Sequence, residues 1–508
     1  FKDGFNEAGK DSKKKSKLIK RLLCQDRHAK IPSELTADKF NSFFASIGKK
    51  TVSNISNDSN QSDLKWKYGK SLNNFEFNDF DEYDVFKLLR SLGEESSNDI
   101  LDMDAKLITV SSHVLSPFVT KIFNISIRCG IVIEDWKLSR VTPIYKGKGD
   151  VLDESNYRPI SVIGHLPKVL EKLVKTQIMT HLVNNDLISI DQSAYRQAHN
   201  TQTSLHKVIE DWLDNLSDKL ITGICLLDIS KCFDTISHDL LLQKMNYYGI
   251  SGIENKWFKS YLSQRTQVVS CNGKISSQQP VEIGVPQGSV LGPVLFLLYV
   301  NDLPNNVHLG SCNMYADDTI IYTTGKDVDE VSCKLQASVD HASKWYDDNK
   351  LVVNALKSNV MLIRTPHMMR KDPNLKLDIM LKDVQLDQVD KCTYLGVTLD
   401  NTMSWDPQIN KVCKQLGGKI QYLKKAKSLK LGKQACLDIY QTKIQPVIDY
   451  ALTVWGAVPR YQLGRVQHLQ NYAARLILDN FDYRYTNGID LVKELDIMYI
   501  EQRLTYFD

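Results

Sequence analysis

The sequence predicts an α+β fold in which an antiparallel sheet carries helices on one face. An apolar run of strand length, residues 221–227, ends in Asp228. Two β-favouring runs flank Asp317 and Asp318, a pattern typical of a tight hairpin. Segments with the apolar spacing of amphipathic helices separate these strands. Strands interleaved with helices form a layered sheet of this kind, and a central pair of strands can bring Asp228 opposite Asp317.

Composition places the chain among ordinary folded proteins. Its 508 residues are enough for several domains, and the 42% hydrophobic and 24% charged content argues against wholesale disorder. The net charge of +4 is too small to indicate nucleic-acid binding, so the distribution of charge has to decide. Ten cysteines stand without any C-x-x-C pair, which favours reduced thiols of an intracellular protein over disulfides or a zinc site.

Two features bear on membrane insertion and on the extent of the chain. The apolar run 290–300 is about half of the ~20 residues that a membrane-spanning helix needs, so we expect a buried helix and no membrane segment. The sequence begins with Phe1 and shows no secretory signal, so we expect a fragment of a longer protein.

Residues 1–105 predict a helical extension. Lysines crowd the first thirty residues, which favours a solvated helix face over a nucleic-acid contact. Residues 35–47 and 80–92 have helical spacing, and the polar stretch 53–63 between them is typical of a linker.

Residues 106–215 carry the next group of predicted elements. A helix over 107–129 is expected to be interrupted at Pro117. Within 136–150, a short strand runs into a lysine- and glycine-rich turn at Lys146, which suits a phosphate, although this segment alone favours a surface hairpin. The following elements are a helix at 166–182, a polar loop at 192–201 and a helix ending near Leu216.

Residues 216–402 contain the acids. A helix and two short strands, 266–270 and 279–283, precede a glycine-bracketed turn at 284–289 that opens the buried helix. The run 288–292 does not fit the G-x-S-x-G nucleophile elbow, because its serine is one place early, and this removes the obvious hydrolase interpretation. The later elements are a long helix at 328–349, a strand at 360–363 and a β run at 392–399.

Residues 403–508 predict a helical region with a segment of one charge sign. No acid occurs from Pro407 to Leu437, whereas a solvated helix normally mixes signs along its face. This segment is the best electrostatic footprint for a phosphate backbone in the chain. Its lysines are Lys411, Lys414, Lys419, Lys424, Lys425, Lys427, Lys430 and Lys433.

The predicted sheet would bring three carboxylates to one site. Like charges a few ångströms apart repel each other unless a cation lies between them. Asp228, Asp317 and Asp318 would form the ligand set for two magnesium ions about 3.5–4 Å apart, which stabilise the attacking and leaving oxygens of nucleotidyl transfer. For the Asp317-Asp318 pair alone, a solvated turn is the alternative.

These motifs, taken in order, resemble the reverse transcriptase of non-LTR (LINE-type) retrotransposons, particularly jockey-like elements. The resemblance runs from about Leu107 to the C-terminus. The matching pieces are 156–161, 192–201, 227–234, 284–301, 315–319, 354–357 and 394–396. Group II intron reverse transcriptases share the Tyr-Ala-Asp-Asp stretch, but the wording of residues 288–296 favours the retrotransposon branch.

The resemblance implies a right-hand polymerase and a metal site. The fingers would be 106–215, the palm 216–402 with a fingers segment near 251–290, and the helical thumb 403–508. The implied ligands of two Mg²⁺ ions, or of Mn²⁺, are Asp228, the Ile229 carbonyl, Asp317 and, more weakly, Asp318. The implied general acid toward the leaving pyrophosphate is Lys357.

The resemblance also implies substrate contacts. Lys146 and Arg158 would grip the dNTP triphosphate, and Gln287 would line the nucleotide pocket. Phe233 would exclude a 2′-hydroxyl sterically. The implied primer grip is Tyr394, Leu395 and Gly396, and the implied template or duplex contacts are Arg196, Lys411, Lys414, Lys424 and Lys425.

The function predicted in this way is RNA-directed DNA polymerase activity of a retrotransposon. An RNA template, a DNA primer or target and dNTPs are the implied partners, in a ribonucleoprotein of the nucleus and cytoplasm. One alternative is a decayed or co-opted copy that binds RNA without chemistry, against which the intact acids and Lys357 argue. Another is an RNA-dependent RNA polymerase, which the bulky Phe233 disfavours.

Two departures from the family pattern accompany the resemblance. Residues 96–100 stand where many relatives have a glycine-rich segment, which leaves the start of the fingers open. The sequence contains no recognisable upstream endonuclease, zinc knuckle or RNase H-like acid set. We therefore expect a chain that polymerises but does not nick its own target.

Overall fold

The computed structural model describes residues 18–19, 31–53, 73–94, 99–101 and 103–507. The lysine-rich start, nearly all of the expected linker at 53–63 and residues 96–98 lie outside this set. The nine described cysteines are free, and six of them are buried. Across these described ranges, no helix is long and apolar enough to cross a membrane.

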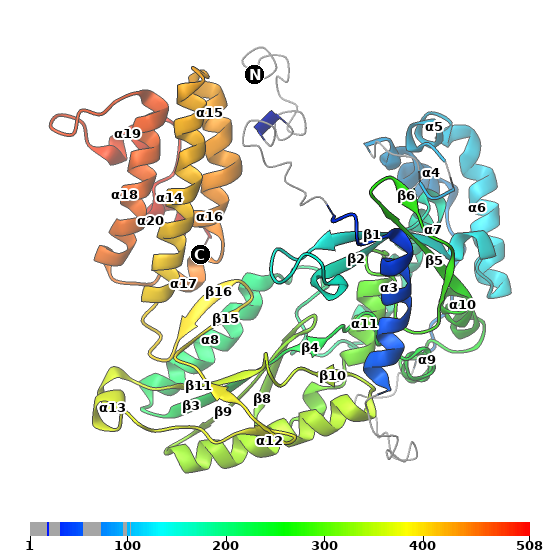
Figure 1. Ribbon diagram of the computed structural model, residues 1–508, viewed down its shortest axis with the longest axis horizontal. Coiled ribbons are helices and arrows are strands. Elements are labelled where there is room, and N and C mark those ends of the chain that lie inside the picture. The colour runs from blue at the N-terminus through cyan, green and yellow to red at the C-terminus, as the bar shows by residue number, and fades with distance from the viewer. Residues whose placement is uncertain (1–17, 20–30, 54–72, 95–98, 102, 508) are drawn as a thin grey trace.

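A five-stranded sheet with the order β14-β11-β3-β9-β8 lies at the base of the molecule as drawn in Figure 1. Its middle strand β3 (Ile221–Leu227) pairs antiparallel with β9 (Asp318–Gly325) and with β11 (Asn359–Ile363). β8 (Ser311–Tyr315) pairs antiparallel with β9, and β14 (Asp387–Gln388) pairs parallel with β11. The predicted strand before Asp228 and the predicted Asp317-Asp318 hairpin are confirmed.

Helices cover both faces of this sheet, which corrects the expectation of helices on one face. α12 (Val328–Asp348) packs on one face and α8 (Thr201–Ser217) on the other (Figure 1). Within β3, Cys225 belongs to the core that contains α12, and Ile224 to the core that contains α8. Successive strand side chains point to opposite faces, so an unbroken apolar strand needs cover on both sides. The α+β class itself is confirmed.

A second sheet is built from two distant parts of the sequence. β1 (Leu138–Tyr145) pairs antiparallel with β2 (Tyr157–Val162) and parallel with β5 (Arg265–Cys271). β6 (Lys274–Ile275) and β7 (Gln279–Val281) both pair with β5. The lysine-rich turn after β1 is thus the tip of a hairpin.

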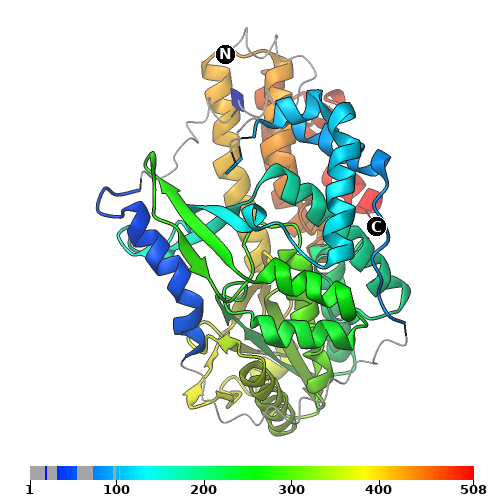
Figure 2. The same cartoon turned by 90° about the vertical axis from the view of Figure 1, so that its right-hand side faces the viewer.

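α3 (Ala37–Val52) lies along this second sheet (Figures 1 and 2). Its Phe40 and Phe44 share a small core with Tyr157 of β2 and Val269 of β5. The helix predicted at 35–47 is therefore part of a sheet layer rather than a separate unit.

Further helices surround the two sheets. They are α4 (Glu82–Ser91), α5 (Ala105–Val110), α6 (Ser112–Cys129), α7 (His165–Asn184), α9 (His238–Tyr247), α10 (Gly252–Leu262) and α11 (Gly292–Val300). The predicted helix at 107–129 breaks at Ser111 and not at Pro117, which lies inside α6. Pro117 has no N–H for the His113 carbonyl, and the Ser116 hydroxyl donates to that oxygen instead at 3.4 Å.

The C-terminal part is a short hairpin followed by helices. The elements after β11 are α13 (Pro366–Lys371), β12 (Met380–Leu381), β13 (Val384–Gln385), β15 (Lys391–Tyr394), β16 (Val397–Asp400), α14 (Asp406–Ser428), α15 (Lys433–Ile439), α16 (Gln445–Asp449), α17 (Leu452–Trp455), α18 (Arg460–Leu478), α19 (Gly488–Glu494) and α20 (Ile500–Phe507). In Figure 1 the helices α14 to α20 and the second sheet stand on opposite sides, with the central sheet below both.

A buried ion pair fixes three helices beneath the central sheet. Lys244 on α9 is 1% exposed, and its Nζ lies 2.6 Å from Oδ1 of Asp302, just past α11. The Lys244 ammonium also donates to the Tyr299 carbonyl at 2.5 Å, and the Trp345 indole N–H of α12 donates to Asp302 Oδ2 at 2.9 Å. Burial lowers the pKa of Lys244, and the Asp302 charge opposes that shift. Both charges thus have several partners.

We predict that Lys244→Met destabilises the protein by about 3–5 kcal/mol, because Asp302 is left as an uncompensated buried charge. The free energy of unfolding in urea measures the loss. Lys87→Met is the control, since Lys87 pairs with Asp84 on the exposed side of α4 and should cost less than about 1 kcal/mol. Equal losses for the two variants would contradict the prediction.

Candidate active site

The register of the central sheet brings the three predicted acids together. Leu227 pairs with Thr319, so Asp228 follows β3 beside Asp318, the first residue of β9. Tyr315 pairs with Asp318 across a tight turn that contains Ala316 and Asp317. Asp228, Asp317 and Asp318 therefore share one end of the sheet, as predicted.

The turn that carries Asp317 is held by a residue that sequence reasoning missed. Gln192 is fully buried, and its Oε1 accepts from the Ala316 N–H at 3.2 Å and from the Ala194 N–H at 2.9 Å. The backbone of the loop pairs with Met314 at the same place. Ala316 has a positive φ of 59°, so this hydrogen bond supports a strained position. No sequence signal links Gln192 to a hairpin so far along the chain.

A turn after β10 (Val352–Val353) holds Asp228 from the other side. β10 pairs with β4 (Ile229–Ser230) immediately after Asp228. The Asp228 carbonyl accepts from the Asn354 N–H at 2.8 Å, and the Asp228 N–H donates to the Ser358 hydroxyl at 3.2 Å. Lys357 Nζ lies 3.7 Å from Asp228 Oδ2. The segment 354–357, one of the pieces that carry the resemblance, thus contacts Asp228 through its backbone and through the Lys357 side chain.

The electrostatics of the acids suit a cation. Burial raises the pKa of Asp228, the charge of Asp317 adds to this shift, and the Lys357 ammonium opposes it. Desolvation by the surrounding protein, with the charges of Asp317 and Asp228, raises the pKa of Asp318 to about 6. Asp228 keeps a side-chain exposure of 45%, so solvent and ligands reach it. Within the described ranges, no group of three His, Cys, Asp or Glu side chains could by itself hold a metal ion.

Cations gather beside the acids. Burial and the nearby charges of Lys231, Lys357 and Arg158 lower the pKa of Lys146 to about 8. Lys146 Nζ donates to the Ser155 carbonyl at 2.6 Å, and Arg158 is exposed on β2. Lys146, Arg158 and Lys357 were predicted from the sequence, whereas Lys231 was missed although it stands three residues after Asp228. This concentration of positive charge fits a polyphosphate.

Phe233 and Gln287 lie on the α11 side of the site. The Phe233 ring stacks on Phe296 of α11 with centroids 5.0 Å apart and an interplanar angle of 28°. The Gln287 side chain donates from Nε2 to Asp234 Oδ1 at 2.9 Å. The glycine-bracketed turn ends at Ser289, whose hydroxyl accepts at 2.9 Å from the N–H of Gly292, the first residue of α11. That serine is therefore structural.

The predicted primer grip is the tip of the β15–β16 hairpin. Tyr394 is buried, and its hydroxyl donates to Asn313 Oδ1 at 3.0 Å. Leu395 is buried as well, whereas Gly396 is exposed with a positive φ of 77°. The Gly396 carbonyl accepts from Lys411 Nζ at 2.8 Å, and the Leu395 carbonyl from the Tyr450 hydroxyl at 2.5 Å. At this tip, the backbone of Gly396 is the part that a ligand can reach.

α14 divides the predicted duplex-binding lysines between two faces. An open groove follows residues three and four apart along one face: Pro407, Asn410, Lys411, Lys414, Gln415, Gly418, Lys419 and Tyr422. Lys425 continues this face three residues beyond Tyr422. Lys424 instead lies over the Tyr472 ring of α18, with Nζ 5.4 Å from the centroid. The structure thus brings Lys411, Lys414 and Lys425 together and separates Lys424 from them.

Arg196 is engaged within its own loop. Its Nη1 donates to the Ser189 carbonyl at 2.8 Å and to the Gln192 carbonyl at 3.1 Å. These bonds brace the loop whose Gln192 holds the Asp317 turn. The predicted template contact at Arg196 therefore falls on a guanidinium that already stabilises this loop.

The sequence is similar to known proteins. The family model described as reverse transcriptase (RNA-dependent DNA polymerase) matches residues 145–399, which contain all three acids and the predicted nucleotide contacts. The probable RNA-directed DNA polymerase from transposon BS of Drosophila melanogaster is 28% identical over 405 residues, covering 76% of this chain and 43% of the relative. The RNA-directed DNA polymerase from mobile element jockey of Drosophila funebris is 30% identical over 384 residues, covering 73% and 41%.

A solved structure of apo telomerase from Candida tropicalis aligns with 54% of this chain and 55% of its own at 13% identity. Its TM-score of 0.36 is too low to support an argument about the fold. The chain spans about two fifths of the length of the curated relatives it matches. On the family match, the chain belongs to the reverse transcriptase family, and its similarity is to jockey-like non-LTR retrotransposon polymerases.

Proposed function

We propose that this chain is the polymerase part of a retrotransposon reverse transcriptase. It would add dNTPs to a DNA primer 3′-OH along an RNA template. The observation that carries the proposal is the convergence of Asp228, Asp317 and Asp318 beside a group of cations. In this proposal 106–215 are fingers, 216–402 the palm with a fingers segment near 251–290, and 403–508 the thumb, after the extension 1–105.

The donor set fits divalent metal ions, on which the reverse transcriptase family generally depends. Oxygen ligands suit Mg²⁺ and Mn²⁺. A cation would offset the desolvation and the repulsion from Asp317 and Asp228, which together raise the pKa of Asp318. Asp228 and Asp317 would hold two such ions, with the Ile229 carbonyl and Asp318 as further ligands. When bound, the ions supply positive charge that stabilises the attacking and leaving oxygens.

The chain's own side chains would act on the incoming nucleotide. Lys146, Arg158 and Lys231 would bind the triphosphate through charge-assisted hydrogen bonds. Phe233, held by its stacking on α11, would fill the space beneath the sugar and exclude a 2′-hydroxyl. Lys357 Nζ would give a proton to the leaving pyrophosphate, a role in which a positioned lysine contributes about 10²–10⁴-fold.

The nucleic acid would be held by the hairpin and by α14. The exposed backbone at Gly396 would contact the primer terminus, and Lys411 ties that hairpin to α14. Lys414 and Lys425 continue from there along the grooved face of the helix. This arrangement supports a phosphate track that leads away from the acids.

We predict that Asp317→Asn lowers primer extension by at least about 10²–10³-fold, because the site loses a full negative charge toward the metal ions. The assay uses the full chain with a primed RNA, Mg²⁺ and dNTPs. Asp327→Asn is the matched control, since Asp327 caps α12 at the other end of β9 and asparagine caps equally well.

Equal extension by wild type and Asp317→Asn would show that the metal site is wrongly assigned. Binding of primed RNA by the wild type without any extension would instead favour the co-opted RNA-binding alternative.

We predict that Phe233→Ala admits ribonucleotides, because removing the ring opens space for a 2′-hydroxyl. The ratio of kcat/KM for a dNTP to that for the matching rNTP should fall by about tenfold or more. Phe258→Leu, a buried change on α10, is the control for a general loss of packing. An unchanged ratio in Phe233→Ala would rule out the steric gate.

We predict that Lys414→Ala combined with Lys425→Ala flattens the salt dependence of primer–template binding. The slope of log K against log salt should fall by about 0.9 for each phosphate that the variant no longer neutralises. The control is Lys424→Ala combined with Lys430→Ala, which removes the same amount of charge. Lys424 lies over the Tyr472 ring, so this variant should leave the slope close to that of the wild type. Equal slopes for the two double variants would show that the grooved face of α14 is a solvated surface that does not contact phosphates.

A further inference from the structure

The turn that presents Gln287 is hydrogen-bonded to residues 233–236, which follow β4. The Gly284 N–H donates to the Ile236 carbonyl at 2.9 Å, and the Val285 N–H donates to the Phe233 carbonyl at 2.8 Å. A side chain at Gly284, whose φ is +82°, would come within 2.7 Å of the Phe233 carbonyl oxygen. Residues 233–236 thus determine where the backbone of this turn lies.

The same turn also reaches the second sheet. The Ser161 N–H of β2 donates to the Gln287 carbonyl at 2.6 Å. At Gly288, whose φ is +115°, an added Cβ would lie 2.6 Å from the Ser161 carbonyl oxygen. Residues 233–236 on one side and Ser161 on the other therefore fix the backbone of Gln287. Its side chain can still rotate.

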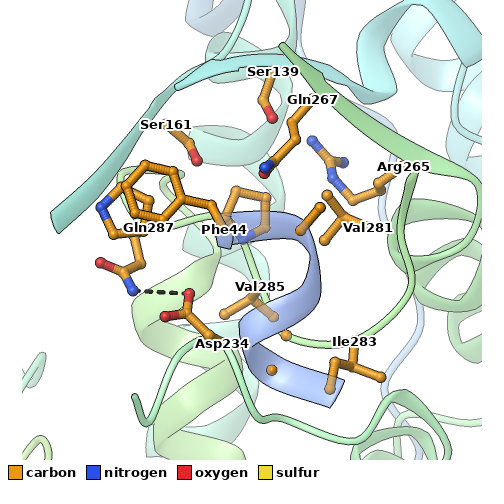
Figure 3. Close-up of a pocket in the computed structure, with 15 residues that line it drawn as sticks. Phe44, Ser139, Ser161, Asp234, Arg265, Gln267, Val281, Ile283, Val285 and Gln287 are labelled. Carbon is orange, nitrogen blue, oxygen red and sulfur yellow. Dashed lines mark hydrogen bonds between the residues drawn. The ribbon is translucent and has the colours of Figure 1, made fainter. Parts of the chain in front are cut away.

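One side-chain contact removes that freedom. Gln287 Nε2 donates to Asp234 Oδ1 at 2.9 Å (Figure 3). An ionised carboxylate only accepts hydrogen bonds, so it must face the amide nitrogen. Figure 3 shows the Gln287 amide oxygen on the side away from Asp234. Among the described residues, that oxygen has no hydrogen-bond partner of its own.

The buried position of the Asp234 carboxylate lowers the stability of the fold. Its Oδ2 is buried and, among the described residues, has no hydrogen-bond partner, in a pocket whose walls include Phe44, Val285 and Ile283 (Figure 3). Burial raises the pKa of Asp234 to about 6, against the stabilising effects of Gln287, Lys231 and Lys146. A half-satisfied buried carboxylate is destabilising, and such groups are found where function requires them.

We propose that Asp234 is a positioning residue for the Gln287 amide. It holds the amide nitrogen toward its own carboxylate and the amide oxygen toward the incoming nucleotide. The proposal rests on the proposed function, in which Gln287 lines the nucleotide pocket. Without the carboxylate, the amide can turn and present either end to the nucleotide. Asp234 would then set nucleotide affinity without touching the substrate.

A double-mutant cycle on the full chain tests the proposal. Asp234→Ala and Gln287→Ala should each raise KM for a dNTP by about tenfold, the scale of one hydrogen bond to a charged group, with kcat changed far less. The KM of the double variant should be no higher than that of Gln287→Ala alone, because both substitutions remove the same interaction. Asp234→Asn keeps an acceptor and should recover much of the affinity.

Val281→Ala is the matched control, because Val281 lines the same pocket and its side chain has no hydrogen-bonding group that could orient the Gln287 amide. Its KM should equal that of the wild type. Additive losses in the double variant, or a fall in kcat without a rise in KM, would overturn the positioning role.

Thermal unfolding gives a readout that does not depend on activity. The pKa of Asp234 is raised to about 6 in the folded protein, whereas an Asp in the unfolded chain keeps its ordinary pKa of about 4. The fold therefore loses stability as the pH rises from about 4 to about 6, and the loss is complete above that pH. Asp234→Asn should therefore raise the melting temperature at pH 7.5 by about 2 °C or more, and the difference should shrink at pH 5. A lower melting temperature at pH 7.5 would show that Asp234 supports the fold and would overturn the proposal.

The neighbouring titratable groups are shared by wild type and variant. Lys231 and Lys146 face Asp234, Arg265 lies across the pocket, and His238 contacts the Gly284 carbonyl. Because these groups are the same in both proteins, the difference between the two pH profiles isolates Asp234.

Failure of the wild type to extend a primer would contradict the proposed function alone. The same cycle is then measured on the dissociation constant of Mg²⁺-dTTP. Coupling between Asp234→Ala and Gln287→Ala in that constant supports the positioning role. A wild type that binds no nucleotide, or a cycle without coupling, overturns it.

Discussion

The mutual repulsion of three carboxylates at one end of the central sheet is the constraint on which the rest of the structure depends. The register of β3 with β9 forces Asp228 and Asp318 together, and the turn before β9 adds Asp317. Separate devices hold these acids in place: the bonds from Asn354 and Ser358 to the Asp228 backbone, and the Gln192 amide at the turn. Each device comes from a different part of the chain. The site therefore forms only when these distant parts of the chain have folded together.

Lysine side chains lie beside the three acids but do not neutralise all of their negative charge. Lys357 pairs with an acid of the site, at 3.7 Å from Asp228, and it is 69% exposed. Lys146 lies against other cations, which together with burial lower its pKa to about 8. Uncompensated charge of both signs suits a ligand that carries both signs itself. A metal-bound triphosphate is such a ligand, because its cation meets the acids and its oxygens meet the lysines.

Local chemistry explains which parts of this structure could be predicted from the sequence. An apolar run ending in Asp228 and two acids between β-favouring runs predict a strand and a hairpin, because strand and turn preferences act over a few residues. The family resemblance singled out Lys357, and the structure shows that its Nζ lies 3.7 Å from Asp228 Oδ2. Gln192, Asp234 and Lys231 escaped prediction because their partners are distant in sequence or arise only from a turn. The same limit explains Lys424: charge alone predicts a basic segment, whereas the packing of α14 on α18 decides which face each lysine occupies.

The turn at 284–289 connects the second sheet to the residues that follow β4. Its first half is bonded to the residues after β4, and its second half to β2 of the second sheet. The buried Glu171 carboxylate of α7 accepts from the Val290 and Leu291 N–H groups at 2.6 and 3.1 Å, at the N-terminal end of α11, where a negative charge is favourable. Movement of the second sheet relative to the central sheet would therefore displace Gln287 before it displaced the acids. Gln287 is thus held between β2 and the residues after β4, whereas Asp228 and Asp317 lie at one end of the central sheet.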